Sequence, residues 1–151
     1  MDMLRGQVVV NHKCEAFLAN DIINDVQFVL YYFSASWCPP CETFLPLMKQ
    51  LADEIERREL LMQILYVPSD HDQDEMFEFF SKNHGHWFAV PVGPVTAKIR
   101  SKYHVYSIPA LVVVAKDGHL VTRNGRRELE ERGVDVLLLW FPDLDTESPG
   151  P

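Results

Sequence analysis

The stretch that decides the fold runs from Phe28 to Glu42 and reads FVLYYFSASWCPPCE. Its first six residues are apolar, and most of them are β-branched or aromatic, which predicts a fully buried strand in a parallel pairing. Pro39 and Pro40 indicate the start of a helix, because proline is tolerated in the first helical turn, where its missing N–H has no partner. Cys38 and Cys41 therefore lie where the chain turns from a strand into a helix.

These two cysteines have the spacing and the setting of a reactive dithiol. A CxxC pair next to a strand–helix–strand pattern indicates thiol–disulfide chemistry. If Cys38 is the N-cap, the N–H of Cys41 is the natural partner of the Cys38 sulfur, and the helix dipole adds positive potential there. Thiols in such positions have pKa values lowered to roughly 3.5–7.5. We therefore expect Cys38 to be the attacking thiol and Cys41, one turn further on, to be the less exposed resolving thiol.

Residues 32–41, which read YFSASWCPPC, resemble the active-site strand of tryparedoxins and of nucleoredoxin and nucleoredoxin-like proteins, within the thioredoxin superfamily. The motif WCPPC is more specific than a bare CxxC pair. Three further stretches extend the resemblance to most of the chain, from about residue 7 to 141: WFAVP at 87–91, VYSIP at 105–109 and TRNGR at 122–126. The resemblance implies an α/β thioredoxin-like fold with a central mixed β-sheet flanked by helices on both faces.

The resemblance also implies a substrate-binding surface around the dithiol. Its expected members are Trp37, Pro39, Pro40, Ile108 and Pro109. In the family the bond before the equivalent of Pro109 is cis, although a cis bond is rare for X–Pro in general, at about 5–6% in folded proteins. A cis bond here is expected to place the Ile108 backbone beside Cys38, where it can pair with an extended substrate peptide.

Three residues are candidate modulators of the dithiol, and each has a competing interpretation. Tyr32 occupies the position of a buried aspartate in thioredoxins, where its hydroxyl either orients water or the Cys41 thiol or belongs to an ordinary core side chain. The charge of Glu42 disfavours a thiolate, but an acid in the first turn also favours the helix. Asp70 matches an acidic residue near the dithiol of the family, or belongs to the N-cap region of the next helix.

Hydrophobic periodicity and turn residues predict the remaining elements. We expect a helix from Pro39 to Arg58 with an irregularity at Pro46. The other predicted strands are Gln7–Val10, Leu61–Val67, Ala110–Ala115 and Leu120–Thr122, and the other predicted helices lie at Glu15–Ile23, around Met76–Phe80, at Val95–Val105 and at Asp135–Phe141. Arg123–Arg127 reads as a loop. Together these elements predict a single domain over residues 1–141, and the polar composition after Phe141 predicts a disordered tail over 142–151.

Charge and composition exclude several classes of function. The net charge of −8 and the pI near 5.1 argue against nucleic-acid binding and against binding to anionic membranes. Residues 1–6 contain no long apolar segment, and no run approaches the length of a transmembrane helix, so we expect a cytoplasmic protein, with the nucleus as a second compartment. Cys14 reads most simply as a free thiol. A homodimer, through an exposed sheet edge or through Cys14, is left open.

A zinc site is the alternative interpretation of the cysteines. Cys38 and Cys41 could be joined by His84 and His86, since cysteine and histidine are zinc ligands. The two histidines lack the usual His-x₃₋₅-His spacing, and the resemblance already accounts for the thiols. We therefore expect no metal and no cofactor other than the redox-active Cys38–Cys41 pair.

Two hypotheses of different classes follow for the function. The first is an enzyme that reduces protein disulfides through a mixed disulfide and is renewed by a thiol reductant or a reductase. The second, implied by the resemblance to nucleoredoxin-like proteins, is a redox-sensitive regulator that binds signalling proteins or transcription factors. A module of this fold with an unused site is a third interpretation, which the intact WCPPC motif disfavours.

Overall fold

A computed structural model describes residues 2–143. Within that range, seven strands form one mixed sheet in the order β2-β1-β5-β4-β3-β6-β7. The strands are β1 Val8–Val10, β2 Ala16–Leu18, β3 Phe28–Ser34, β4 Met62–Pro68, β5 Phe88–Ala89, β6 Ala110–Ala115 and β7 Leu120–Thr122. The tail predicted to be disordered lies outside the described residues from residue 144 onward. Among residues 2–143, no helix combines the length and the apolar composition that crossing a bilayer requires.

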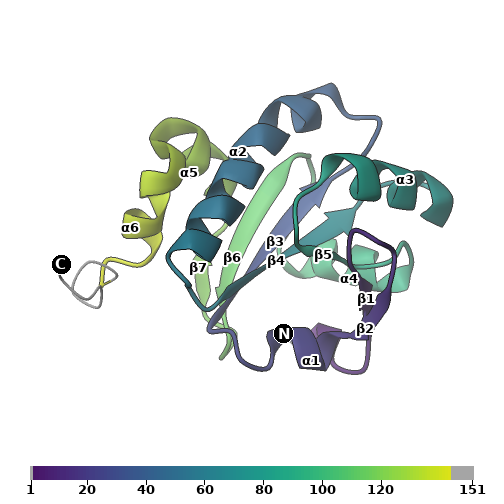
Figure 1. Ribbon diagram of the computed structural model, residues 1–151, viewed down its shortest axis with the longest axis horizontal. Helices are drawn as coiled ribbons and strands as arrows, with labels where there is room; N and C mark the ends of the chain where they lie inside the picture. The colour runs from purple at the N-terminus through teal and green to yellow at the C-terminus, as the bar shows by residue number, and fades with distance from the viewer. Residues whose placement is uncertain (1, 144–151) are drawn as a thin grey trace.

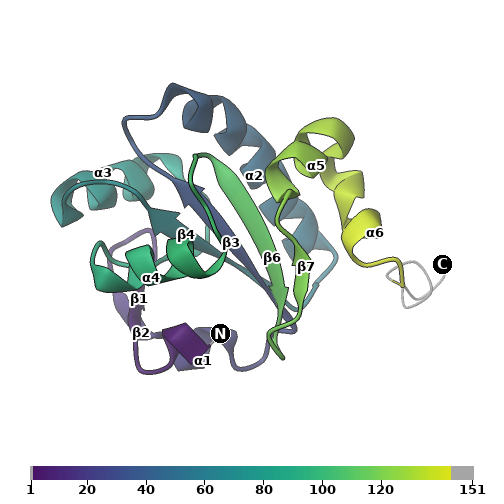
Figure 2. The ribbon, with the colours of Figure 1, turned by 180° about the vertical axis from the view of Figure 1, so that it is seen from behind.

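The helices lie on both faces of this sheet, as predicted. They are η1 Asp2–Leu4, α1 Ala19–Ile23, α2 Pro39–Arg57, α3 Gln73–Asn83, α4 Pro94–Lys102, α5 Gly125–Arg132, η2 Gly133–Asp135 and α6 Val136–Trp140. Figure 1 views the sheet from the side that α2, α5 and α6 cover. Figure 2 shows α4 in front of the opposite face.

The central strand β3 explains why the core has two halves. Successive side chains of a strand point to opposite faces, and every residue from Val29 to Ser34 is buried. Leu30 and Tyr32 pack under α2 with Phe44, whereas Val29, Tyr31 and Phe33 pack on the other face with residues of α1 and α4. The continuous apolar run is therefore needed because both faces of this strand are covered.

The pairing of β3 also decides where the dithiol lies. β3 runs parallel to β4, with Ser34 opposite Pro68, and antiparallel to β6, with Phe33 opposite Ala110. The carboxyl ends of β3 and β4 therefore meet the start of β6 at one edge of the sheet. The loops that begin after Ser34 and Pro68, and the loop that ends at Pro109, consequently come together there.

Helix α2 begins at Pro39, as the two prolines predict, and it continues past Pro46, where the sequence predicts an irregularity. Cys38 is its N-cap, with Pro39 and Pro40 in the first turn. Pro46 lies inside the helix without ending it. The buried side chains of the helix form one stripe against the sheet, with Cys41 at its start and Ile55 at its end.

Two predicted segments differ in the structure, and hydrogen bonds explain both. Ala16–Leu18, predicted as helix, is a strand antiparallel to β1, because the Asn11 side chain accepts the N–H groups of Lys13 and Glu15 and closes a tight turn. The predicted loop Arg123–Arg127 becomes helical at Gly125. There the Thr122 hydroxyl accepts the N–H of Asn124, whose carbonyl then accepts the first helical N–H, that of Glu128.

Candidate active site

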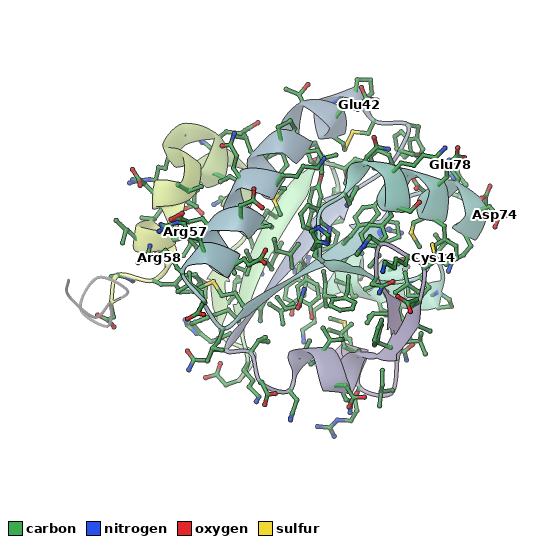
Figure 3. All side chains as sticks on the ribbon, in the orientation of Figure 1. Cys14, Glu42, Arg57, Arg58, Asp74 and Glu78 are labelled. Carbon is green, nitrogen blue, oxygen red and sulfur yellow. A yellow bond between two sulfur atoms is a disulfide. The ribbon has the colours of Figure 1, made fainter. Side chains whose placement is uncertain are left out.

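The two cysteines of the motif are joined to each other at the N-terminal end of α2. Cys38 and Cys41 form a disulfide, with their Cα atoms 5.2 Å apart. The Cys38 side chain keeps 5% of its exposure and Cys41 keeps none, so Cys38 is the more accessible of the two, as expected. Both pack against Ala35 and Ile108. In Figure 3, Glu42 marks this end of α2, opposite the end that carries Arg57 and Arg58.

The expected hydrogen bond from the Cys41 N–H to the Cys38 sulfur is absent from this oxidised form. The N–H groups of Cys41 and Glu42 instead donate to the Cys38 carbonyl oxygen, at 3.1 and 3.3 Å. A sulfur atom in a disulfide carries no negative charge, so it attracts an N–H much less than a thiolate does. The prediction applies to the reduced form, and it is wrong for the disulfide.

The loop before β6 supplies the second wall of the site. The Ile108–Pro109 peptide bond is cis, which confirms what the family resemblance implies. The Ile108 carbonyl oxygen lies 3.9 Å from the Cys38 sulfur, although 70 residues separate them in sequence. On the other side of the loop, Arg126 of α5 donates from Nη1 to the Pro109 carbonyl oxygen at 3.4 Å. The start of α5, which the sequence predicts as a loop, thus stabilises the segment at Pro109 that lies beside the dithiol.

A groove of about 300 Å³ opens beside Cys38, and we call it the Trp37 groove. It is lined by Trp37, Ser69, Arg100 and residues 105–108. The Trp37 side chain is 53% exposed, and its ring stacks on His71 with centroids 6.1 Å apart. The groove thus joins Trp37 to Ile108, two of the five residues expected to bind substrate.

Asp70 belongs to this site and not to the cap of α3. Asp72 is the N-cap, and its carboxylate accepts the Glu75 N–H at 2.8 Å. Asp70 is only 5% exposed, and its Oδ1 accepts the backbone N–H of Ser36 at 2.7 Å. The Ser36 hydroxyl lies between two carboxylates, 3.2 Å from Asp70 Oδ1 and 3.1 Å from Glu75 Oε1. Asp70 therefore holds the loop that leads into Cys38.

Burial raises the pKa of Asp70, and the two hydrogen bonds from Ser36 offset part of that rise. A raised folded-state pKa means that the folded protein binds the proton more tightly than the unfolded chain does. The stability that Asp70 contributes is therefore greatest below its ordinary pKa and is lost as the pH rises through the folded-state pKa.

We accordingly expect the Asp70→Asn variant to gain stability relative to the wild type as the pH rises from about 4 to 8. Asparagine keeps an oxygen that accepts the Ser36 N–H but carries no charge to desolvate. Urea unfolding of both proteins across this pH range measures the difference. Asp74→Asn, which removes an exposed carboxylate of α3, is the control for the loss of one negative charge. If the free energies of unfolding of Asp70→Asn and the wild type differ by the same amount at every pH, the account is contradicted.

Tyr32 lies in the core under α2. Its ring contacts Phe44, Tyr66, His84 and Trp87, with centroids 5.6 to 6.3 Å apart. Burial raises the pKa of Tyr32 to about 12, and the Ser34 hydroxyl offsets part of the rise. The phenol is therefore neutral at physiological pH. These contacts favour the core interpretation of Tyr32 over a role at Cys41.

His84, a candidate ligand in the zinc alternative, is also a core residue. The Trp87 Nε1–H donates to His84 Nδ1 at 3.2 Å, and burial lowers the pKa of His84 to about 3. Its ring lies 4.3 Å from that of Tyr66. Among residues 2–143, no three side chains of His, Cys, Asp or Glu are grouped as a metal site would need.

Of three further residues of the site, Glu75 and Arg100 carry no signal in the sequence, and Arg126 carries only its place in the TRNGR stretch. Glu75 reads as a first-turn acid of α3, Arg126 as part of a solvated charged face, and Arg100 as one of several bases on α4. Their places at Ser36, at Pro109 and in the Trp37 groove depend on contacts between distant segments, which local patterns do not encode.

Comparisons with known proteins agree with this geometry. A family model described as thioredoxin-like matches residues 25–120. Probable nucleoredoxin 1 of Arabidopsis thaliana is 32% identical over 120 residues, which are 79% of this chain and 20% of the relative. The chain thus spans about a fifth of the length of that curated relative.

Solved structures match over nearly the whole chain. The thioredoxin related protein 16 of Carcinoscorpius rotundicauda is 34% identical, with a TM-score of 0.79, covering 93% of this chain and 99% of that one. Tryparedoxin I of Crithidia fasciculata is 27% identical, with a TM-score of 0.76, covering 88% and 91%. The fold, the WCPPC dithiol and these matches together show that the chain belongs to the thioredoxin-like family, within which it is similar to tryparedoxins and nucleoredoxins.

Proposed function

We propose that this chain is a thiol–disulfide oxidoreductase that reduces protein disulfides with Cys38 and Cys41. The observation that carries the proposal is the position of the pair. Cys38 is the N-cap of α2, Cys41 lies within disulfide-bonding reach of it, and the Ile108 carbonyl oxygen is 3.9 Å from the Cys38 sulfur. A reversible disulfide beside a backbone carbonyl is what exchange with an extended peptide requires.

The proposed reaction has two exchange steps. The Cys38 thiolate attacks one sulfur of the substrate disulfide, a bond forms between them, and the other substrate sulfur leaves and takes up a proton. The Cys41 thiol then loses its proton and attacks the Cys38 sulfur, which releases the second substrate thiol. Two electrons have passed to the substrate, and the Cys38–Cys41 disulfide remains. A thiol reductant or a reductase must restore the dithiol before the next cycle.

The other residues support these steps in the proposal. Substrate contacts are assigned to five residues around the dithiol: Trp37, Pro39, Pro40, Ile108 and Pro109. Asp70 positions the Ser36 segment before Cys38, and Glu42 adds negative charge near the N-terminus of α2. No metal or organic cofactor enters the scheme. A reducing compartment, cytoplasmic and secondarily nuclear, suits a dithiol that must be returned to its reduced form.

A second candidate is a redox-sensitive regulator that binds signalling proteins or transcription factors. The observation that favours it is the similarity to the Carcinoscorpius protein, whose structure is described with a role in regulating the transcription factor NF-kB. In this case the dithiol acts as a switch, and complex formation depends on its oxidation state.

Reduction of insulin with dithiothreitol as the donor separates the two candidates. The oxidoreductase proposal predicts a rate well above that of dithiothreitol alone, lost in Cys38→Ser and retained in Cys14→Ser, since Cys14 is exposed and unpaired with another cysteine. A wild-type rate equal to that of dithiothreitol alone would contradict the proposal. The regulator would then be tested by comparing the complexes that the oxidised and reduced proteins form.

A further inference from the structure

The Trp37 groove contains a charged side chain that the exchange chemistry does not use. Arg100 projects into it from α4, whose own sequence, PVTAKIRSK, contains no acidic residue. The remaining lining consists of Trp37, Ser69 and residues 105–108, all of them uncharged. No carboxylate of the lining therefore neutralises the guanidinium.

Arg100 is already held in place. Its Nη1 donates to the Pro68 carbonyl oxygen at 3.2 Å and to the Ser69 hydroxyl at 3.4 Å. Both hydrogen bonds to the described residues use Nη1, which leaves Nε and Nη2 for a ligand. An arginine anchored in this way loses little additional side-chain entropy when it binds, and its planar fork matches a carboxylate.

The groove is continuous with the dithiol. Ile108 lines the groove, packs against Cys38 and places its carbonyl oxygen 3.9 Å from the Cys38 sulfur. A substrate cysteine positioned for attack by Cys38 therefore has its neighbouring residues over the groove. Tyr106, which is 86% exposed, supplies an aromatic wall against which the methylene groups of an acidic side chain can pack.

We propose that the Trp37 groove selects substrates that carry a carboxylate, so that the preferred substrate is a disulfide-bonded polypeptide segment with Asp or Glu close to its reactive cysteine. Arg100 is the specificity-determining residue in this assignment. A single arginine with one nitrogen engaged suits a carboxylate, whereas phosphate sites usually gather several arginines. The inference rests on the proposed oxidoreductase function, because it names the substrate class of that reaction.

The test uses a set of short peptides, each with one cysteine joined to 2-thiopyridine as a mixed disulfide. Glutamate is placed at each position within three residues of the cysteine, and a glutamine peptide matches each one. Release of 2-thiopyridone is followed in single turnovers of the reduced full-length protein over a range of peptide concentrations, which gives the single-turnover kcat, KM and kcat/KM without any added reductant. At the best position we expect the glutamate peptide to exceed its glutamine partner by about tenfold, mainly through KM. In Arg100→Gln, which keeps a donor for Pro68, this ratio should fall to near one.

The ratio within one variant cancels any general loss of activity, and Lys98→Gln is the matched control. Lys98 is exposed on α4 and does not line the groove, so its removal should leave the ratio high. If the protein turns over the peptides but the glutamate-to-glutamine ratio is near one at every position, the carboxylate assignment is wrong and the oxidoreductase proposal stands. The same conclusion follows if the ratio stays high in Arg100→Gln, or if phosphoserine peptides react faster than glutamate peptides. Absence of any turnover that depends on Cys38 would overturn the oxidoreductase proposal and this inference with it.

Discussion

The Cys41→Ser variant is expected to accumulate as a covalent complex with its substrate, and the Cys38→Ser variant is expected to form none. Without Cys41, the mixed disulfide between Cys38 and the substrate has no internal thiol to resolve it. Cys41 is fully buried in the first turn of α2, whereas Cys38 retains some exposure, so the two thiols are not interchangeable. Each reduced variant is incubated with native, disulfide-bonded insulin, and the complex is measured by a non-reducing gel and mass spectrometry.

Cys14 is the cysteine that could imitate this result, because it is exposed and not in a disulfide. The control is therefore the pair of double variants that also carry Cys14→Ser. The complex should persist in the double variant that keeps only Cys38. It should be absent in the double variant that keeps only Cys41. Equal trapping through either cysteine would contradict the assignment of Cys38 as the attacking thiol.

Gly125→Ala is expected to destabilise the protein by about 3 kcal/mol and to lower its Tm by roughly 10 °C. A Cβ at this position would lie 2.7 Å from the Leu111 carbonyl oxygen and 2.9 Å from Leu111 Cγ. Leu111 is in β6, opposite Tyr32 of the central strand, so its backbone is not free to move away. Glycine is thus needed here for the close approach of α5 to the sheet. Thermal and urea unfolding measure the change.

The sign of the change in the free energy of unfolding distinguishes a steric clash from ordinary helix propensity. In an unobstructed helix the same substitution stabilises by up to about 1 kcal/mol, because alanine is the better helix former. Gly93→Ala is the control, since no atom lies within 4 Å of the added Cβ, and it should change the free energy of unfolding by less than about 1 kcal/mol. A neutral or stabilising Gly125→Ala would show that α5 does not pack on β6 as described.

The features that the sequence predicts correctly are those that local chemistry specifies. The run from Phe28 to Phe33 is apolar at every position, a pattern typical of a strand covered on both faces. Pro39 and Pro40 begin a helix because of their own backbone geometry. The cis bond before Pro109 came from the resemblance and not from proline alone, since most X–Pro bonds are trans.

The features that the sequence does not predict depend on side chains that satisfy distant or unusual partners. Ala16–Leu18 pairs with β1 because Asn11 closes the preceding turn through its side chain, and hydrophobic periodicity does not record that bond. Asp70 looks like a helix-cap residue until its partner, the Ser36 N–H, is known. Arg100 looks like a solvated base in sequence, and Arg126 is distinguished only by the TRNGR stretch, yet they donate to the backbone carbonyl oxygens of Pro68 and Pro109.

The most direct test of the central claim is the stoichiometry of a single turnover without any added reductant. Reduced wild-type protein is mixed with an excess of a peptide disulfide, and the released thiols and the state of each cysteine are measured by mass spectrometry. The account predicts two substrate thiols per protein molecule, a Cys38–Cys41 disulfide and a free Cys14. Release of one thiol, with the peptide still attached to the wild-type protein, would contradict a dithiol oxidoreductase.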